Sequence, residues 1–105
     1  MKESTLKMNL VKRDNEAKIS LIGWLDATNA PDAQKVLEQQ AERFDRIELD
    51  LKELEYISSA GLRALKVLQM KMSDKGERVV IRNVREDVKS VFKVTGFYRL
   101  FKFED

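Results

Sequence analysis

Alternating apolar and polar residues predict β-strands in several segments of the chain. The clearest is Arg46–Leu51, where isoleucine and leucine occupy every second position and charged residues occupy the others. A weaker pattern over Leu6–Val11 predicts a first strand that ends within Lys12–Asn15, and a longer pattern over Ala17–Leu25 predicts a second. The polar stretch Arg13–Glu16 between them favours a hairpin turn. A further strand is expected in Arg78–Asn83, because three consecutive β-branched residues there indicate a buried strand.

Apolar residues spaced three and four apart predict three helices. The first follows a break in the pattern that contains Pro31, a residue tolerated in a first helical turn, and it ends at about Arg43. The second spans about Ser59–Ser73, and Gly76 after it is suited to a left-handed C-terminal cap. The third spans Val84–Val94.

These elements follow the order β-β-α-β-α-β-α. The apolar tail Phe97–Phe103 is expected to form a last helical turn or an edge segment that covers the core. Strands separated by single helices favour parallel, right-handed crossovers, whereas the opening hairpin makes the sheet mixed. We therefore expect an α/β fold with one domain over residues 1–105, a mixed sheet of about four strands and three to four helices packed on it.

Composition argues against most catalytic chemistry. The chain has no cysteine and no histidine, so it lacks disulfides, the commonest general base and the commonest zinc ligand. The acidic residues Asp50, Glu53 and Glu55 are irregularly spaced, which favours a solvated surface over a metal site. We expect a protein that is not an enzyme and needs no cofactor or metal.

Charge and hydropathy limit the class of partner. The 20 basic and 18 acidic residues are interleaved, whereas a nucleic-acid interface would favour a basic stripe. Residues 1–7 are polar and lack the apolar centre of a signal peptide, and no apolar run is long enough to span a bilayer. We expect a cytoplasmic protein, a monomer or weak dimer, that binds neither nucleic acid nor membranes.

The segment Tyr56–Arg63 is the most specific part of the sequence. Ser58 and Ser59 open the second helix, where free backbone amides and the helix dipole favour an anion. A phosphate on Ser59 would add about −1.5 to −2 charges at this point. Local physics favours the simpler interpretation of a serine cap, worth about 1 kcal/mol, and Ser58 can be that cap while Ser59 is a switch. The small pair Ala60 and Gly61 either leaves the backbone open to another molecule or packs tightly on the sheet.

Three parts of the chain match the motifs of a known family. The strand pair Asp50-Leu51, the apolar bridge Tyr56-Ile57 and the helix start Ser58–Leu62 resemble its central signature. Gly23–Ala27 resembles its Gly-x-Leu-Asp motif, and Phe92–Phe97 resembles its late Thr-Gly segment. On these segments the chain resembles STAS domains, and particularly the bacterial anti-sigma factor antagonists.

The resemblance implies partner switching. In that family the unphosphorylated antagonist binds an anti-sigma factor that is also a serine kinase, and so frees the sigma factor. The kinase then phosphorylates the serine at the helix start, the complex separates, and a PP2C-type phosphatase resets the antagonist. Carried over by position, the phosphoacceptor is Ser59. The implied partner surface comprises Asp26, Ser58, Ser59, Ala60, Gly61 and Arg63.

The chain departs from the family pattern beside the acceptor. Ser58 stands where aspartate is common, and Ala60 stands where serine or threonine is frequent. Ser58 is therefore an alternative acceptor, and the alternative function is a STAS scaffold or a lipid- or nucleotide-sensing module without phosphorylation. Asp26 is equally a partner contact or a cap of the first helix, for which Thr28 and Asn29 are also candidates. Trp24 is a binding anchor or, slightly favoured, a sheet-packing residue.

Overall fold

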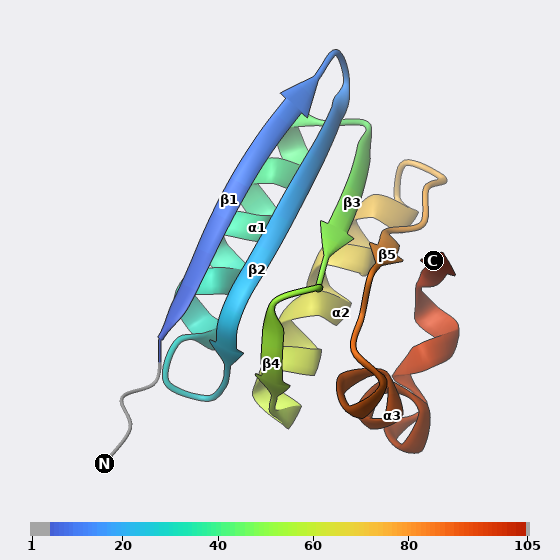
Figure 1. Cartoon of the computed structure of the whole chain (residues 1–105). Coiled ribbons are helices and arrows are strands. Elements are labelled where there is room, and N and C mark those ends of the chain that lie inside the picture. Colours follow the sequence, from blue (N-terminus) through green and yellow to red (C-terminus); the bar gives the residue numbers. More distant parts are fainter. Residues whose placement is uncertain (1–4, 105) are drawn as a thin grey trace.

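The computed structural model describes residues 5–104, which form one mixed sheet, three α-helices and a 3-10 turn (Figure 1). The elements are β1 (Leu6–Arg13), β2 (Glu16–Leu25), α1 (Ala30–Arg43), β3 (Arg46–Asp50), β4 (Leu54–Ile57), α2 (Ser59–Ser73), β5 (Val80–Arg82), α3 (Glu86–Thr95), the 3-10 turn η1 (Phe97–Leu100) and β6 (Lys102–Glu104). The expected mixed α/β fold is confirmed. The sheet has six strands among the described residues, where the sequence predicted about four.

The two additional strands have clear physical origins. The sheet order is β1-β2-β3-β5-β6, and β4 also pairs with β2. Because β2 is ten residues long, its first half pairs with β3 while Gly23–Leu25 pairs with β4, a segment in which the sequence pattern predicted no strand. The register shifts between Gly23 and Trp24, where Gly23 has a φ of 106°. The end of the apolar tail forms β6 beside β5 after a 3-10 turn, so both alternatives proposed for that tail are present.

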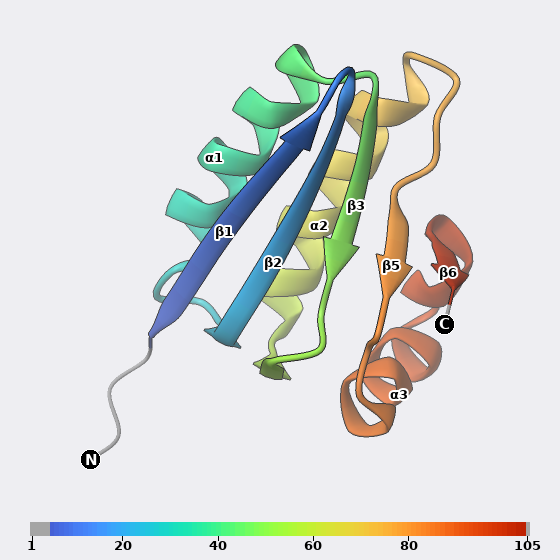
Figure 2. The same cartoon turned by 45° about the horizontal axis from the view of Figure 1, so that its top comes forward.

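One face of the sheet is covered and carries the core. Helices α1 and α2 lie against it, as the two views of the ribbon agree (Figures 1 and 2). The strands turn Ile19, Leu21 and Leu49 toward the helices, and α2 contributes Leu65 and Leu68. The predicted alternation in β2 and β3 is confirmed, because the intervening residues Ser20, Ile22, Glu48 and Asp50 are only half-buried.

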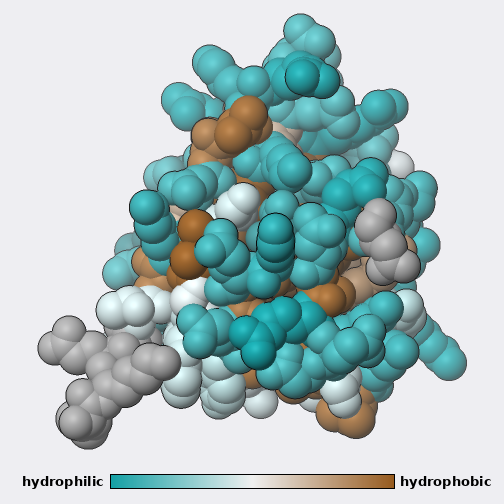
Figure 3. Space-filling model, in the orientation of Figure 1, coloured by the Kyte–Doolittle hydropathy of each residue, from teal (hydrophilic) through white to brown (hydrophobic). Residues whose placement is uncertain are grey.

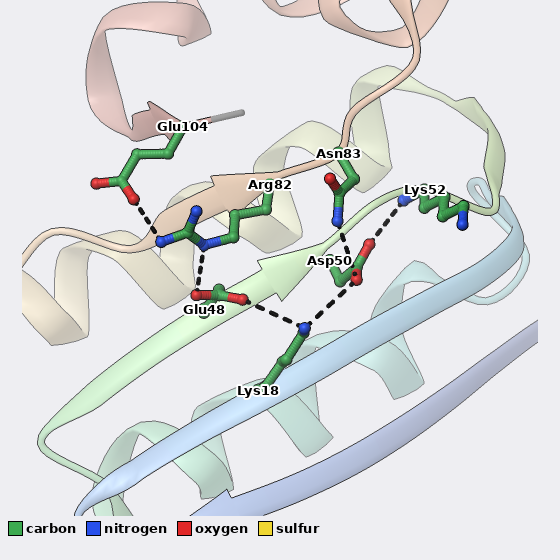
Figure 4. A network of polar contacts seen from close by, with 7 residues as sticks. All are labelled: Lys18, Glu48, Asp50, Lys52, Arg82, Asn83 and Glu104. Carbon is green, nitrogen blue, oxygen red and sulfur yellow. Dashed lines mark hydrogen bonds and ion pairs between the residues drawn. The ribbon is translucent and has the colours of Figure 1, made fainter.

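The opposite face of the sheet is open and largely hydrophilic (Figure 3). A network of ion pairs crosses four of its strands (Figure 4). Lys18 of β2 lies 3.8 Å from both Glu48 and Asp50, and Arg82 of β5 lies 2.7 Å from Glu48 and 2.6 Å from Glu104. The hydrogen bond from Arg82 to Glu48 raises the pKa of the guanidinium above its ordinary value, so this side chain stays charged. The interleaved charges of the sequence thus pair across strands.

The helix ends follow the sequence signals with two corrections. After α2, Gly76 has a φ of 76°, and the Gly76 and Glu77 amides donate to the carbonyls of Ser73 and Met72 in a Schellman arrangement. The third helix begins at Glu86 and not at Val84. The strand predicted before it is also shorter, since β5 ends at Arg82 and the next residue has a left-handed backbone with a φ of 59°.

The aromatic residues near the end of the chain cover the core, as predicted. Phe101 is buried, and its ring meets the buried ring of Phe92 edge-on with centroids 5.7 Å apart. Tyr98 and Phe103 stack at 4.4 Å. None of the helices formed by residues 5–104 combines the length and apolar character that a bilayer crossing requires.

Candidate functional site

The start of α2 is attached to the end of β2. Strand β4 brings Ile57 opposite Leu25, and the Ser58 amide then donates to the Leu25 carbonyl at 2.9 Å. Residues from two distant parts of the sequence, Asp26 and Ser58, therefore follow neighbouring strand ends at one edge of the sheet.

Ser58 is the N-cap of α2. Its backbone is extended, with φ −96° and ψ 175°, and its hydroxyl oxygen accepts a hydrogen bond from the Gly61 amide at 3.2 Å. The Leu62 amide donates to the Ser58 carbonyl and closes the first turn. The structure therefore assigns the cap, which local physics had offered to either serine, to Ser58.

Ser59 occupies the next position and is exposed. Its hydroxyl forms no hydrogen bond with another residue in the described part of the chain. The first turn of α2 contains no acidic residue, and Arg63 is exposed four residues later on the same side of the helix. The helix start therefore carries an exposed hydroxyl, free of acidic neighbours in the first turn, with an exposed guanidinium one turn further along.

Ser58→Ala tests the division of roles between the two serines. The variant removes the acceptor of the Gly61 amide, so we expect it to lower the free energy of unfolding by about 1 kcal/mol in urea denaturation. Ser90→Ala, a matched change at an exposed position of α3, is expected to stay within about 0.5 kcal/mol of the parent. Equal stabilities of the two variants would contradict the assigned cap.

Gly61 serves packing and is not open to another molecule. It is buried, and a Cβ added there would lie 2.8 Å from both the Leu25 Cγ and the Leu25 carbonyl oxygen, and 2.9 Å from the Ile57 Cγ1. Of the two interpretations of the small pair, tight packing on the sheet is therefore correct for Gly61. Ala60 is half-buried and remains accessible from outside.

Asp26 organises the loop before α1. Its carboxylate accepts hydrogen bonds from the backbone amides of Thr28 at 3.0 Å and Asn29 at 3.4 Å. Asn29 stands at the N-cap position of α1 without a side-chain cap bond, because its amide group bonds to the Asp26 amide and the Trp24 carbonyl. These hydrogen bonds show that Asp26 orders the loop. Because Asp26 is only half-buried, its side chain also borders the surface.

Trp24 contacts Tyr56, a residue of the apolar bridge that precedes α2. Its ring lies 4.8 Å from the ring of Tyr56, its register partner on β4, and Tyr56 is 43% exposed. The favoured packing role of Trp24 is thus confirmed. Tyr56 directly precedes Ile57 and Ser58 at the start of α2. The contact between Trp24 and Tyr56 could have been predicted only from the pairing of β2 with β4, and the sequence pattern did not predict β4.

Known proteins match nearly the whole chain. The STAS domain model matches residues 7–105. BtrV of Bordetella bronchiseptica, a candidate anti-sigma factor antagonist, is 30% identical over an alignment of 97 residues that covers 91% of this chain and 84% of BtrV.

Solved structures give the same result for the fold. An anti-sigma factor antagonist from Mycobacterium paratuberculosis is similar with a TM-score of 0.82 and 19% identity, over 94% of this chain and 85% of that chain. SpoIIAA, a cell fate determinant of Bacillus, is 16% identical in both of its forms and covers 96% of this chain. Its unphosphorylated form has a TM-score of 0.78 over 89% of that chain, and its phosphorylated form has 0.72 over 92%.

Proposed function

The chain belongs to the STAS domain family, with anti-sigma factor antagonists among its relatives, and we propose that it switches an anti-sigma factor kinase between partners. The unphosphorylated chain binds the kinase and so frees a sigma factor. The kinase phosphorylates Ser59, the complex separates, and a PP2C-type phosphatase removes the phosphate. The chain is the ligand and substrate in this cycle, acts in the cytoplasm as a monomer or weak dimer, and has no catalytic residue of its own.

The observation that carries the proposal is the contrast between the two serines. Ser58 is half-buried and its hydroxyl is engaged as the helix cap, whereas Ser59 is exposed. In the transfer, the Ser59 hydroxyl oxygen attacks the γ-phosphorus of ATP held by the kinase. The bond to the bridging oxygen breaks, ADP leaves, and the hydroxyl proton passes to a base of the kinase. This geometry supports Ser59 as the acceptor and makes Ser58 the poorer candidate.

The fold is suited to carry the phosphate without rearranging. The helix dipole favours a negative charge at this end of α2 by about 0.3–1 kcal/mol. SpoIIAA has the same fold in its phosphorylated and unphosphorylated forms, which supports a switch that acts on the surface of the domain. Release then comes from charge and bulk placed in the interface, because a desolvated contact tolerates an unmatched anion poorly.

The proposal is tested by forming the complex with the cognate anti-sigma factor kinase and then adding nucleotide. We expect ATP to dissociate the complex on gel filtration and a non-hydrolysable ATP analogue to leave it intact. The Ser59→Ala chain should bind the kinase and stay bound in ATP. Dissociation of the Ser59→Ala complex by ATP would contradict the proposal, and a lipid or nucleotide purified with the chain would instead favour a sensing module.

A further inference from the structure

A groove runs beside Ser59 between the N-terminal halves of α1 and α2. It measures about 390 Å³ and is lined by small residues at its base, among them Ala30 and Ala60. Ala60, which lines the groove, directly follows Ser59 in the chain, so the groove lies next to the proposed phosphoacceptor. Other hollows lie elsewhere: the one lined by Asp14, Asp45 and Glu77 is at the opposite ends of the strands.

The charges around this groove are unbalanced. Lys35 of α1 and Arg63 of α2 are exposed, line the groove, and form no ion pair within residues 5–104. The acidic side chain of the lining, Glu38, lies 3.9 Å from Lys71 and is thereby partly neutralised. The groove therefore presents two positive side chains above a base of alanines.

We infer that this groove receives an acidic segment of the anti-sigma factor kinase, with a small apolar side chain on the alanine base and carboxylates beside Lys35 and Arg63. The inference rests on the proposed function and deepens it by naming the chemistry of the partner surface. Charge complementarity selects this occupant, because a basic segment would meet two cations and a neutral one would leave both without a partner.

The same arrangement explains how a phosphate on Ser59 is sensed. Ser59 and Arg63 are four residues apart on one side of α2, a spacing at which opposite charges attract. A phosphoryl group would draw Arg63 away from the groove and would repel the acidic segment at the same time. Arg63 is thus a positioning residue: it contacts the acidic segment of the partner in the unphosphorylated chain and the phosphoryl group in the phosphorylated chain.

The test is a double charge reversal, Lys35→Glu with Arg63→Glu, measured by calorimetry with the nucleotide-free kinase. We expect the affinity to fall by about 30-fold or more, and the dependence of affinity on salt to weaken. Lys12→Glu is the control for a charge reversal outside the groove, because it changes an exposed lysine on β1 and should alter affinity by no more than about threefold. If the double reversal does not fold, the neutral double variant Lys35→Gln with Arg63→Gln replaces it in the measurement. This variant should lower the affinity by about tenfold.

Wild-type affinity and salt dependence in the folded double variant would overturn the inference, as would an equal loss in Lys12→Glu. The outcome is separable from that of the proposed function. If Ser59→Glu abolishes binding while the groove variants bind normally, the groove inference fails and the switch stands. If Ser59→Glu also binds normally, the switch itself fails.

Discussion

Ser59→Glu is expected to leave the domain folded and to weaken binding of the anti-sigma factor kinase by about 100-fold or more, a loss of about 2.8 kcal/mol. The fold should tolerate the change because Ser59 is exposed and forms no hydrogen bond with a described residue. A carboxylate in the first turn of α2 also interacts favourably with the helix dipole. The partner has no such compensation, since the new charge would lie in the contact and beside the acidic segment inferred for the groove. Calorimetry gives the affinity, and thermal denaturation gives the stability.

Two variants separate the causes of that loss. Ser59→Gln adds nearly the same bulk without the charge, so its affinity should fall less than that of Ser59→Glu. Ser59→Ala adds neither and should bind as the parent does. If the folded Ser59→Glu chain keeps the affinity of Ser59→Ala, position 59 is outside the contact and partner switching through this residue is wrong.

Gly61→Ala should destabilise the domain by about 2 kcal/mol, although glycine to alanine in a helix ordinarily stabilises by up to about 1 kcal/mol. The sign is reversed because the added Cβ would lie 2.8 Å from the Leu25 carbonyl oxygen, well inside contact distance. That same carbonyl accepts the Ser58 amide. Relief of the clash therefore has to move α2 away from β2, and the hydrogen bond that fixes the helix start is weakened. Urea denaturation measures the change.

The effect on function should follow the displacement of the helix. Because Ser59 is two residues before Gly61, a shift of α2 moves the acceptor relative to the Asp26 loop, so partner affinity should fall together with stability. Ser59→Ala is the stability control, since it places alanine in the same turn at an exposed position and should change the free energy of unfolding by less than about 0.5 kcal/mol. A neutral or stabilising Gly61→Ala would show that the helix does not approach the strand as closely as described.

The helices and strands with a strong apolar periodicity could be predicted from the sequence. The short strands that form only by pairing with a neighbouring strand could not. The apolar alternation of β3 and the three-and-four spacing of α2 each report burial of one face, so the boundaries of α2 at Ser59 and Ser73 match the prediction. β4 and β6 are four and three residues long. Segments so short contain too few alternations to be recognised, and they become strands because β2 and β5 offer an edge to pair with.

The sequence could predict which residues lie at the candidate site, but it could not assign a role to each of them. The motif identified Ser58 and Ser59 as neighbours at a helix start, but only coordinates assign the cap to Ser58 and the exposed position to Ser59. The contact of Gly61 with Leu25 joins residues 36 positions apart in the numbering, and the charged groove needs the packing of α1 on α2. Such relations depend on tertiary structure, which local sequence does not encode.

The most direct test of the account is to locate the phosphate after incubation of the chain with its cognate kinase and ATP. Trypsin should release the peptide Glu53–Arg63, which contains both serines, because cleavage is possible after Lys52 and after Arg63. Fragment ions that break the bond between Ser58 and Ser59 then distinguish the two sites. The account predicts one phosphate, on Ser59, and none in the Ser59→Ala chain. Phosphate on Ser58 alone, or a complex that ATP dissociates without any phosphate in this peptide, would contradict it.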